Sequence, residues 1–210
     1  MDGRIAALAL GAVGIGLGAG GYYAYFGQGD RFEACRTVQM VGREQIGGPF
    51  SLIDTTGSRV SEAEVIDGLT LIYFGYTFCP DVCPFDLSRN AEAVAQLEEA
   101  GIMVKPVFIT IDPARDTPQE MAKFTEYMHP RMVGLTGTQA EIDAVTLAYR
   151  AYSSKQANTD EGGEDLYLMD HSVFSYLMHP DEGLLQVFGR AERAEELAAT
   201  TSCYAGILNG

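Results

Sequence analysis

Basic side chains are scarce in this sequence. It has 14 lysines and arginines against 29 aspartates and glutamates, which gives a formal net charge of −15 at pH 7. A protein that binds nucleic acid needs a basic face to replace the counterions around the phosphates, so the composition argues against nucleic acid as a partner. It also disfavours binding to an anionic lipid surface. The charge suits a partner with a basic patch, although solubility alone is the simpler explanation.

Nucleophiles and soft metal ligands are also few, with only 4 cysteines and 3 histidines in 210 residues. Hydrophobic residues make up 47% and charged residues 20% of the chain. This is close to a normal globular composition and excludes disorder for most of the chain. The length fits one domain of ordinary size plus an appendage.

Charged residues are absent from residues 5–26, which read IAALALGAVGIGLGAGGYYAYF. About 20 consecutive apolar residues are enough to cross a bilayer, and three tyrosines cluster at the end of this run, where aromatic rings favour the lipid–water boundary. A cleaved signal peptide is the main alternative, but the run is longer than a usual signal core and no clear small-x-small cleavage site follows it. We therefore expect a single uncleaved transmembrane helix within residues 1–27, followed by a tether over residues 28–48.

Uninterrupted apolar runs mark the centre of the domain. LTLIYF at residues 69–74 and VKPVFITI at residues 104–111 are typical of strands buried on both faces. Capping boxes, Thr117 with Glu120 and Thr138 with Glu141, predict the starts of two helices.

The remaining elements complete an alternating pattern. We predict a hairpin around Thr56-Gly57, a third strand at residues 132–135, a second hairpin over residues 173–188 and a final helix from residue 191 to about 205. Alternating strands and helices imply an α/β sheet with helices on both faces. The closing hairpin adds antiparallel strands, so the sheet is expected to be mixed.

The strongest chemical signal is the pair Cys79 and Cys83 at a strand-to-helix junction. Free N–H groups and the macrodipole at a helix N-terminus stabilise negative charge, so we expect a lowered thiol pKa here. Two cysteines four positions apart lie about one helical turn apart and can face the same point. They can form a disulfide or hold one soft ion. Prolines and a helix start frame the pair, which argues against two inert, buried cysteines.

A histidine would be the third member of such a site, and His171 is the best placed. It stands just before a strand that we expect to join the central sheet, with Asp170 available to hydrogen-bond the imidazole. His129 and His179 each precede a proline and are interpreted as solvent-exposed turn residues. Two thiolates and one imidazole suit copper, although zinc would accept the same set, usually with a fourth ligand.

Four segments in order resemble the Sco/SenC family of copper chaperones. They are YFGYTFCPDVCP at residues 73–84, TIDPARDTP at 110–118, GLTG at 134–137, and DHS at 170–172 with YLM downstream. The resemblance spans roughly residues 48–190. It implies a thioredoxin-like fold, with a central mixed sheet flanked by helices and an N-terminal hairpin extension, over residues 49–210.

The resemblance also implies a function. Family members are tethered to a membrane with the domain on the periplasmic or equivalent non-cytoplasmic side. Carried over here, one copper ion, Cu(I) or Cu(II), would be held by Cys79, Cys83 and His171. The protein would act as a metallochaperone that assists assembly of the dinuclear copper A site of cytochrome c oxidase subunit II. It would deliver copper to that subunit, reduce its cysteines, or both; another copper or thiol protein is the alternative partner.

Two other functions use the same cysteines. The first is a membrane-anchored thiol–disulfide oxidoreductase or redox sensor acting through Cys79 and Cys83. The second is a peroxidase-like enzyme, for which Arg89 and Arg115 are the candidate arginines. Thioredoxin-like oxidoreductases usually have two residues between the cysteines, whereas this chain has three. That spacing, with a histidine for a third ligand, favours the copper carrier.

The other two cysteines stand outside the motif. Cys35 lies in the expected tether and Cys203 in the last helix. Spare cysteines in an exported domain often pair, so we predict a Cys35–Cys203 disulfide; the alternatives are two thiols, or a fourth metal ligand.

Overall fold

The computed structural model describes residues 30–37, 42, 45–80, 82–156 and 167–210. The chain divides into two compact units, Met1–Arg36 and Thr37–Gly210. In the first unit the described residues form a short 3-10 helix, η1 (Glu33–Cys35), which starts where the Phe32 amide donates to the Asp30 carboxylate at 3.0 Å. The predicted transmembrane helix lies outside the described residues. Across the described ranges, no helix combines the length and the apolar character needed to span a bilayer.

The second unit is built on a seven-stranded mixed sheet with the order β2-β1-β5-β4-β3-β8-β9. Strands β3, β4 and β5 are parallel, and the four outer strands join antiparallel. The predicted mixed sheet and its two hairpins are therefore confirmed. The strands are β1 (Ser51–Asp54), β2 (Arg59–Ser61), β3 (Thr70–Gly75), β4 (Lys105–Thr110), β5 (Val133–Thr136), β8 (Ser175–His179) and β9 (Gly183–Phe188).

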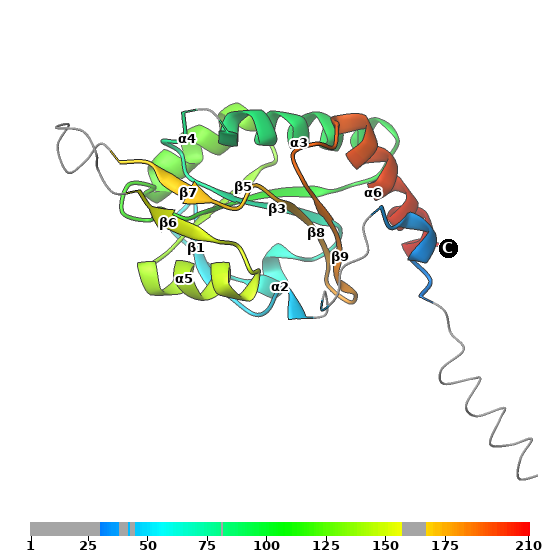
Figure 1. Cartoon of the computed structure of the whole chain (residues 1–210), viewed down its shortest axis with the longest axis horizontal. Helices are drawn as coiled ribbons and strands as arrows, with labels where there is room; N and C mark the ends of the chain where they lie inside the picture. The colour runs from blue at the N-terminus through cyan, green and yellow to red at the C-terminus, as the bar shows by residue number, and fades with distance from the viewer. Residues whose placement is uncertain (1–29, 38–41, 43–44, 81, 157–166) are drawn as a thin grey trace, which may run out of the picture. The chain divides into compact units, whose positions relative to one another are not determined.

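Helices cover both faces of this sheet, as the alternating pattern predicted. Figure 1 shows α3 (Val82–Glu99), α4 (Pro118–Met128) and α6 (Ala194–Leu208) on one side and α5 (Gln139–Ala148) on the other. The short helix α2 (Glu62–Val65) leads from β2 toward β3. Contacts between α3 and α6 and between α3 and α4 make the first group one continuous layer.

The central strands fix where the loops with chemical groups emerge. Every residue of β3 is buried, and β3 pairs with β4 in parallel register from Thr70 opposite Lys105 to Gly75 opposite Thr110. The two strands therefore end side by side. Loops that follow the carboxyl ends of neighbouring parallel strands meet at one edge of the sheet, where α/β proteins commonly bind ligands.

Most helix starts follow the capping signals in the sequence. Thr138 and Glu141 form the predicted capping box of α5. At α4 only half of the predicted box forms: Thr117 accepts from the Glu120 amide, but the Glu120 carboxylate pairs with Lys123 at 2.6 Å. The proline after Cys83 is the third residue of α3, still within the first turn, where a missing N–H breaks no helical hydrogen bond.

A second, two-stranded sheet was not predicted. Strands β6 (Ser153–Lys155) and β7 (Met169–His171) pair antiparallel, with Ser153 opposite His171. His171 therefore ends a strand of this small sheet, and β8, the strand that follows it, pairs with β3 in the central sheet as predicted. Helix α5 ends at Ala148, and just beyond it Arg150 adopts a φ of 52° and Tyr152 is exposed.

Helix α4 offers a test of this packing. Met121 is 0% exposed and lies beside Gly134 of β5, whereas Met103 is 63% exposed. We expect Met121→Ala to lower the free energy of unfolding by about 2–5 kcal/mol, because the lost methylenes leave a cavity. The matched change Met103→Ala should cost less than about 0.5 kcal/mol. Urea denaturation of both variants measures the difference, and equal costs would show that α4 does not pack as described.

Candidate metal centre

The two cysteines lie where β3 passes into α3. Cys79 closes the turn after the strand, with its amide donating to the Tyr76 carbonyl at 3.2 Å, and Cys83 is the second residue of α3. The Cys83 amide, one of the N–H groups that a helix start leaves without a helical partner, donates to the Cys79 sulfur at 3.3 Å. Both side chains are buried thiols.

The imidazole of His171 reaches the same point from the small sheet. Its Nδ1 lies 2.8 Å from the Ser172 carbonyl oxygen, which can only accept, so Nδ1 carries the proton. The lone pair is then on Nε2, which lies 3.4 Å from the Cys83 sulfur. The predicted bond from Asp170 to the imidazole is absent, since the Asp170 carboxylate accepts from the Gln156 side chain at 2.6 Å instead.

These three side chains form a group that can hold a metal ion. One ligand atom from each of Cys79, Cys83 and His171 lies within 4.8 Å of the others, and no other such group of histidine, cysteine or acidic residues occurs in the described ranges. Two sulfurs and an imidazole nitrogen fit a soft ion such as Cu(I). A structural zinc site would normally have a fourth protein ligand.

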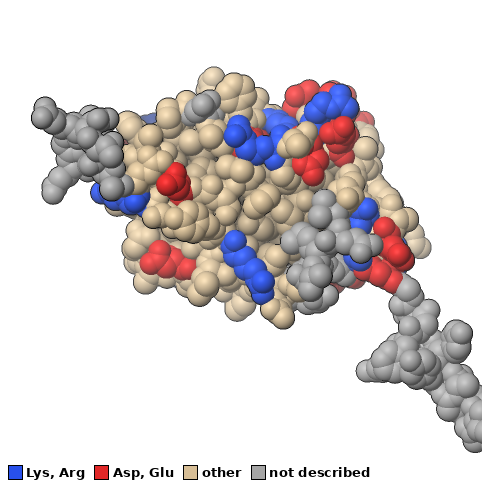
Figure 2. Space-filling model, in the orientation of Figure 1, with Lys and Arg blue, Asp and Glu red and all other residues tan. Residues whose placement is uncertain are grey.

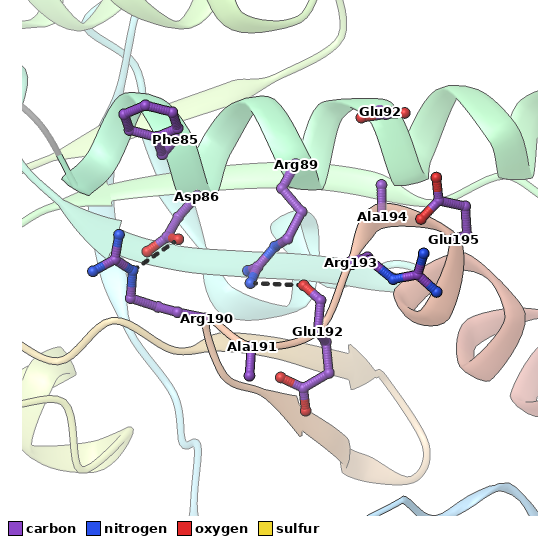
Figure 3. A pocket seen from close by; sticks show the side chains of 10 residues that line it. All are labelled: Phe85, Asp86, Arg89, Glu92, Arg190, Ala191, Glu192, Arg193, Ala194 and Glu195. Atoms are coloured by element: carbon purple, nitrogen blue, oxygen red, sulfur yellow. Dashed lines mark hydrogen bonds and ion pairs between the residues drawn. The ribbon is translucent and has the colours of Figure 1, made fainter.

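The walls of the site are aromatic. The rings of Tyr73 and Tyr76 meet the His171 ring edge-on, with centroid separations of 6.2 and 5.9 Å. The Tyr73 hydroxyl donates to Asp86 at 2.9 Å, and Arg190 pairs with the same carboxylate at 3.4 Å (Figure 3). Burial, with the nearby Cys83 and Asp86, raises the pKa of Tyr73, so this hydroxyl stays a donor.

A hollow of about 440 Å³, lined in part by Asp86 and Arg190, lies between the start of α3 and the segment that leads into α6 (Figure 3). None of the three candidate ligands lines it. Arg89, one candidate for peroxide chemistry, lines the hollow but donates to the Gly189 carbonyl at 2.6 Å and to Ser175 at 3.0 Å. It therefore ties α3 to the end of β9 and is not aimed at the thiols.

The pKa of the Cys83 thiol is shifted in the direction opposite to the prediction. Its hydrogen bond with Cys79 and its burial raise its pKa, whereas the helix start was expected to lower it. The reason is that Cys83 faces the core, where burial and a neighbouring sulfur outweigh the macrodipole. A metal ion that binds here must displace a proton, so affinity should rise with pH.

Gly75, at the end of β3, lets the Cys83 side chain pack very closely against the strand. A Cβ atom added at Gly75 would lie 2.8 Å from the Cys83 sulfur and 2.9 Å from the Phe108 ring. Only glycine leaves room for Cys83 at the end of β3.

The other predicted residues lie away from this group. His129 is buried at the end of α4, with Nε2 3.7 Å from Glu98, so its predicted solvent exposure is wrong. His179 ends β8, and its Nδ1 accepts from the Asp181 amide at 3.3 Å. Cys35 and Cys203 are both disulfide-bonded, as the predicted pairing requires, and neither is available as a fourth ligand.

Sequence reasoning did not identify the residues that hold the site in shape. Tyr73 and Asp116 lie inside the quoted motifs, but nothing in the sequence separates a residue that supports a ligand from one that packs in the core. Asp116 is completely buried and accepts from both the amide and the hydroxyl of Thr77, at 3.0 and 2.5 Å. It thus fixes the chain two residues before Cys79.

The raised pKa of Cys83 predicts slow alkylation. In the reduced, metal-free protein at pH 7, we expect iodoacetamide to modify Cys83 at least about tenfold more slowly than in urea, because each unit of pKa increase removes tenfold of the thiolate. Peptide mass spectrometry after timed quenching measures both rates. Equal rates in folded and unfolded protein would contradict the buried, protonated thiol.

The close approach at Gly75 predicts a local clash. Gly75→Ala should lower the free energy of unfolding by roughly 1–3 kcal/mol, because the added methyl group must displace Cys83 or Phe108. Gly68→Ala is the control, since nothing lies within 4 Å of a Cβ atom there. Urea denaturation of the metal-free proteins gives both values, and a neutral Gly75→Ala would rule out the tight contact.

Comparison with known proteins agrees with the predicted family. The family model described as SCO1/SenC matches residues 38–206. The chain is similar to protein SenC of Rhodobacter capsulatus, with 47% identity over 179 residues, or 85% of this chain and 79% of that protein. It is also similar to protein sco1 of Schizosaccharomyces pombe, with 43% identity over 190 residues, or 88% of this chain and 72% of that protein.

Solved structures show the same likeness. A crystal structure of Arabidopsis thaliana ScoI with copper bound has a TM-score of 0.69 and 39% identity, and the match covers 77% of this chain and 99% of that one. Yeast Sco1 with copper bound has a TM-score of 0.69 and 34% identity over 79% of this chain and 90% of that one. The thioredoxin-like α/β fold predicted from the sequence fits these structures.

Proposed function

The chain belongs to the SCO1/SenC family, and we propose that it is a copper-binding metallochaperone that assists assembly of the copper A site of cytochrome c oxidase subunit II. The observation that carries the proposal is the convergence of two thiols and one Nε2 lone pair within 4.8 Å. Relatives at 39% and 34% identity have structures described as copper-bound. One copper ion per domain, held by Cys79, Cys83 and His171, is the arrangement that we infer.

The donor set suits an ion that must later be released. Three ligands leave copper(I) below the coordination number of a closed structural site, so a thiol or imidazole of the recipient can join before a ligand of this chain leaves. Cys79 is 8% exposed and Cys83 is 0% exposed. A recipient would therefore approach the metal from the Cys79 and His171 side.

The surface next to the thiols is suited to a protein recipient. Phe78 precedes Cys79 and is 51% exposed, and Phe85 follows Cys83 by two positions and is 69% exposed. Exposed aromatic side chains beside a reactive group are typical of sites where proteins dock. On the face shown in Figure 2, charged side chains of both signs lie around a broad uncharged area, with no basic stripe of the kind that binds nucleic acid.

The location of the domain is part of the same proposal. A copper A recipient lies on the non-cytoplasmic side of the membrane, and an anchor within residues 1–27 would hold the domain there. The disulfide-bonded state of Cys35 and Cys203 favours an oxidising compartment.

A second function is favoured by the proximity of the two thiols. The sulfurs of Cys79 and Cys83 lie within 4.8 Å of each other, so the two thiols are candidates for a disulfide once they move into bonding distance. Reduction of a partner disulfide would transfer two electrons and two protons to the partner's sulfurs and leave Cys79 and Cys83 oxidised to a disulfide. Reduction of the recipient's cysteines and delivery of copper can therefore be successive uses of one site.

Substitution of His171 separates the two functions. We expect His171→Ala to weaken copper(I) binding by more than the roughly 10- to 100-fold typical of losing an outer-shell partner, because a direct ligand is lost. Formation of the Cys79–Cys83 disulfide should be unaffected. Competition titration with a copper(I) chelator measures the affinity of the reduced, metal-free protein.

His179→Ala is the matched control, because that imidazole lies at the end of β8 and belongs to no candidate ligand group. Its copper affinity should equal that of the unaltered protein. Copper binding that is weak, or indifferent to His171, would reject the metallochaperone and leave the thiol–disulfide oxidoreductase as the function that fits the site.

A further inference from the structure

Arg115, in the loop after β4, contacts both an acidic side chain of its own loop and the segment before β7. The Arg115 Nε pairs with the Asp112 carboxylate, and its Nη1 donates to the Tyr167 carbonyl at 2.9 Å. The Tyr167 hydroxyl donates to the other oxygen of Asp112 at 2.7 Å. The three residues therefore close a ring of charge-assisted bonds, which we name the Asp112–Arg115–Tyr167 latch.

Aromatic rings complete the surroundings of the guanidinium. It lies 3.6 Å from the centroid of the Tyr167 ring and 4.9 Å from that of Phe78. Its Nη2 is buried and has no hydrogen-bond partner among the described residues. A desolvated cation is costly unless it is paired, and stacking on ring faces recovers part of that cost. The position is therefore specific for a planar, forked cation, which lysine cannot replace.

The latch acts on the hairpin that carries His171. Strands β6 and β7 form their own sheet and do not pair with the seven-stranded sheet, so side-chain contacts must hold them in place. Tyr167 stands two residues before β7, and the Nζ of Lys155 in β6 lies 3.6 Å from the centroid of the Tyr167 ring. A second attachment is the Met169 amide, which donates to the Tyr76 hydroxyl at 3.2 Å.

We propose that Arg115 is a positioning residue for His171, which it holds at the thiols through Tyr167. The neighbouring Asp116 fixes Thr77 before Cys79, so one short loop sets the positions of both ligand-bearing segments. Loss of the latch would let the hairpin move and would reduce the share of molecules in which Nε2 faces the sulfurs. The expected consequence for copper rests on the proposed function.

A double-mutant cycle tests the route through His171. Arg115→Gln should lower copper(I) affinity about tenfold, the lower end of the effect of an outer-shell partner. In a His171→Ala background the same change should cost less than about twofold, because no imidazole remains to be positioned. Arg131→Gln is the matched control, since Arg131 also joins a carboxylate, Glu98, to a carbonyl, Val104. It should leave the affinity unchanged.

Hydrogen exchange of the metal-free protein tests the latch without copper. Arg115→Gln, and more mildly Tyr167→Phe, should speed exchange of the Met169 and Ser172 amides severalfold while exchange in β3 and β4 stays unchanged. The proposal would be overturned by exchange that is faster throughout the domain, or by unchanged exchange at Met169 and Ser172. An equal loss of copper affinity with and without His171 would also overturn it. If the unaltered protein does not bind copper, the metallochaperone fails and the exchange result alone decides on the latch.

Discussion

The buried carboxylate of Asp116 is the contact on which the geometry of the site depends. It accepts from Thr77 and from the Thr110 hydroxyl, and its own backbone carbonyl accepts from Thr136 at 2.8 Å. These partners come from the turn after β3 and from the ends of β4 and β5, so one residue joins the three parallel strands at the edge where ligands bind. Removing the carboxylate would leave the buried Thr110 hydroxyl and the partly buried amide and hydroxyl of Thr77 without this acceptor, which costs more than each bond contributes.

Burial also changes the pKa of the Asp116 carboxyl group. Desolvation raises the pKa of Asp116, while the hydrogen bonds from Thr110 and Thr77 lower it in part. The role of the Asp116 carboxylate is therefore structural: it accepts the hydrogen bonds of the Thr77 turn at the end of β3. Since the Thr77 amide is fixed, the chain can reach Cys79 in only a narrow range of directions.

The thiols and the imidazole are held by different parts of the fold. Gly75 and the start of α3 fix the two sulfurs within the core of the seven-stranded sheet. His171 belongs to a small separate sheet, and its tautomer is set by the Ser172 carbonyl. A ligand set divided in this way combines a rigid pair with a third donor whose position depends on side-chain contacts.

The sequence predicted the parts of the site that rest on local rules. Apolar runs located β3 and β4, capping residues located α5, and the cysteine spacing located the junction. The small sheet escaped prediction because SSK and MDH are too short and polar to show a strand pattern. The rise in the Cys83 pKa also escaped, since it comes from burial and from Cys79, and neither is visible in the helix-start pattern alone.

Burial of the candidate ligands differs in a way that bears on how an ion would leave. Cys83 is fully buried and protonates readily because its pKa is raised, while His171 is only partly buried and is held by contacts outside the core. On the proposed function, an incoming ligand would first replace the imidazole, whose release costs the least reorganisation of the core. Cys83 would be the last ligand to dissociate from the ion. Its protonation would favour completion of the transfer, because a thiol competes poorly with a thiolate for copper(I).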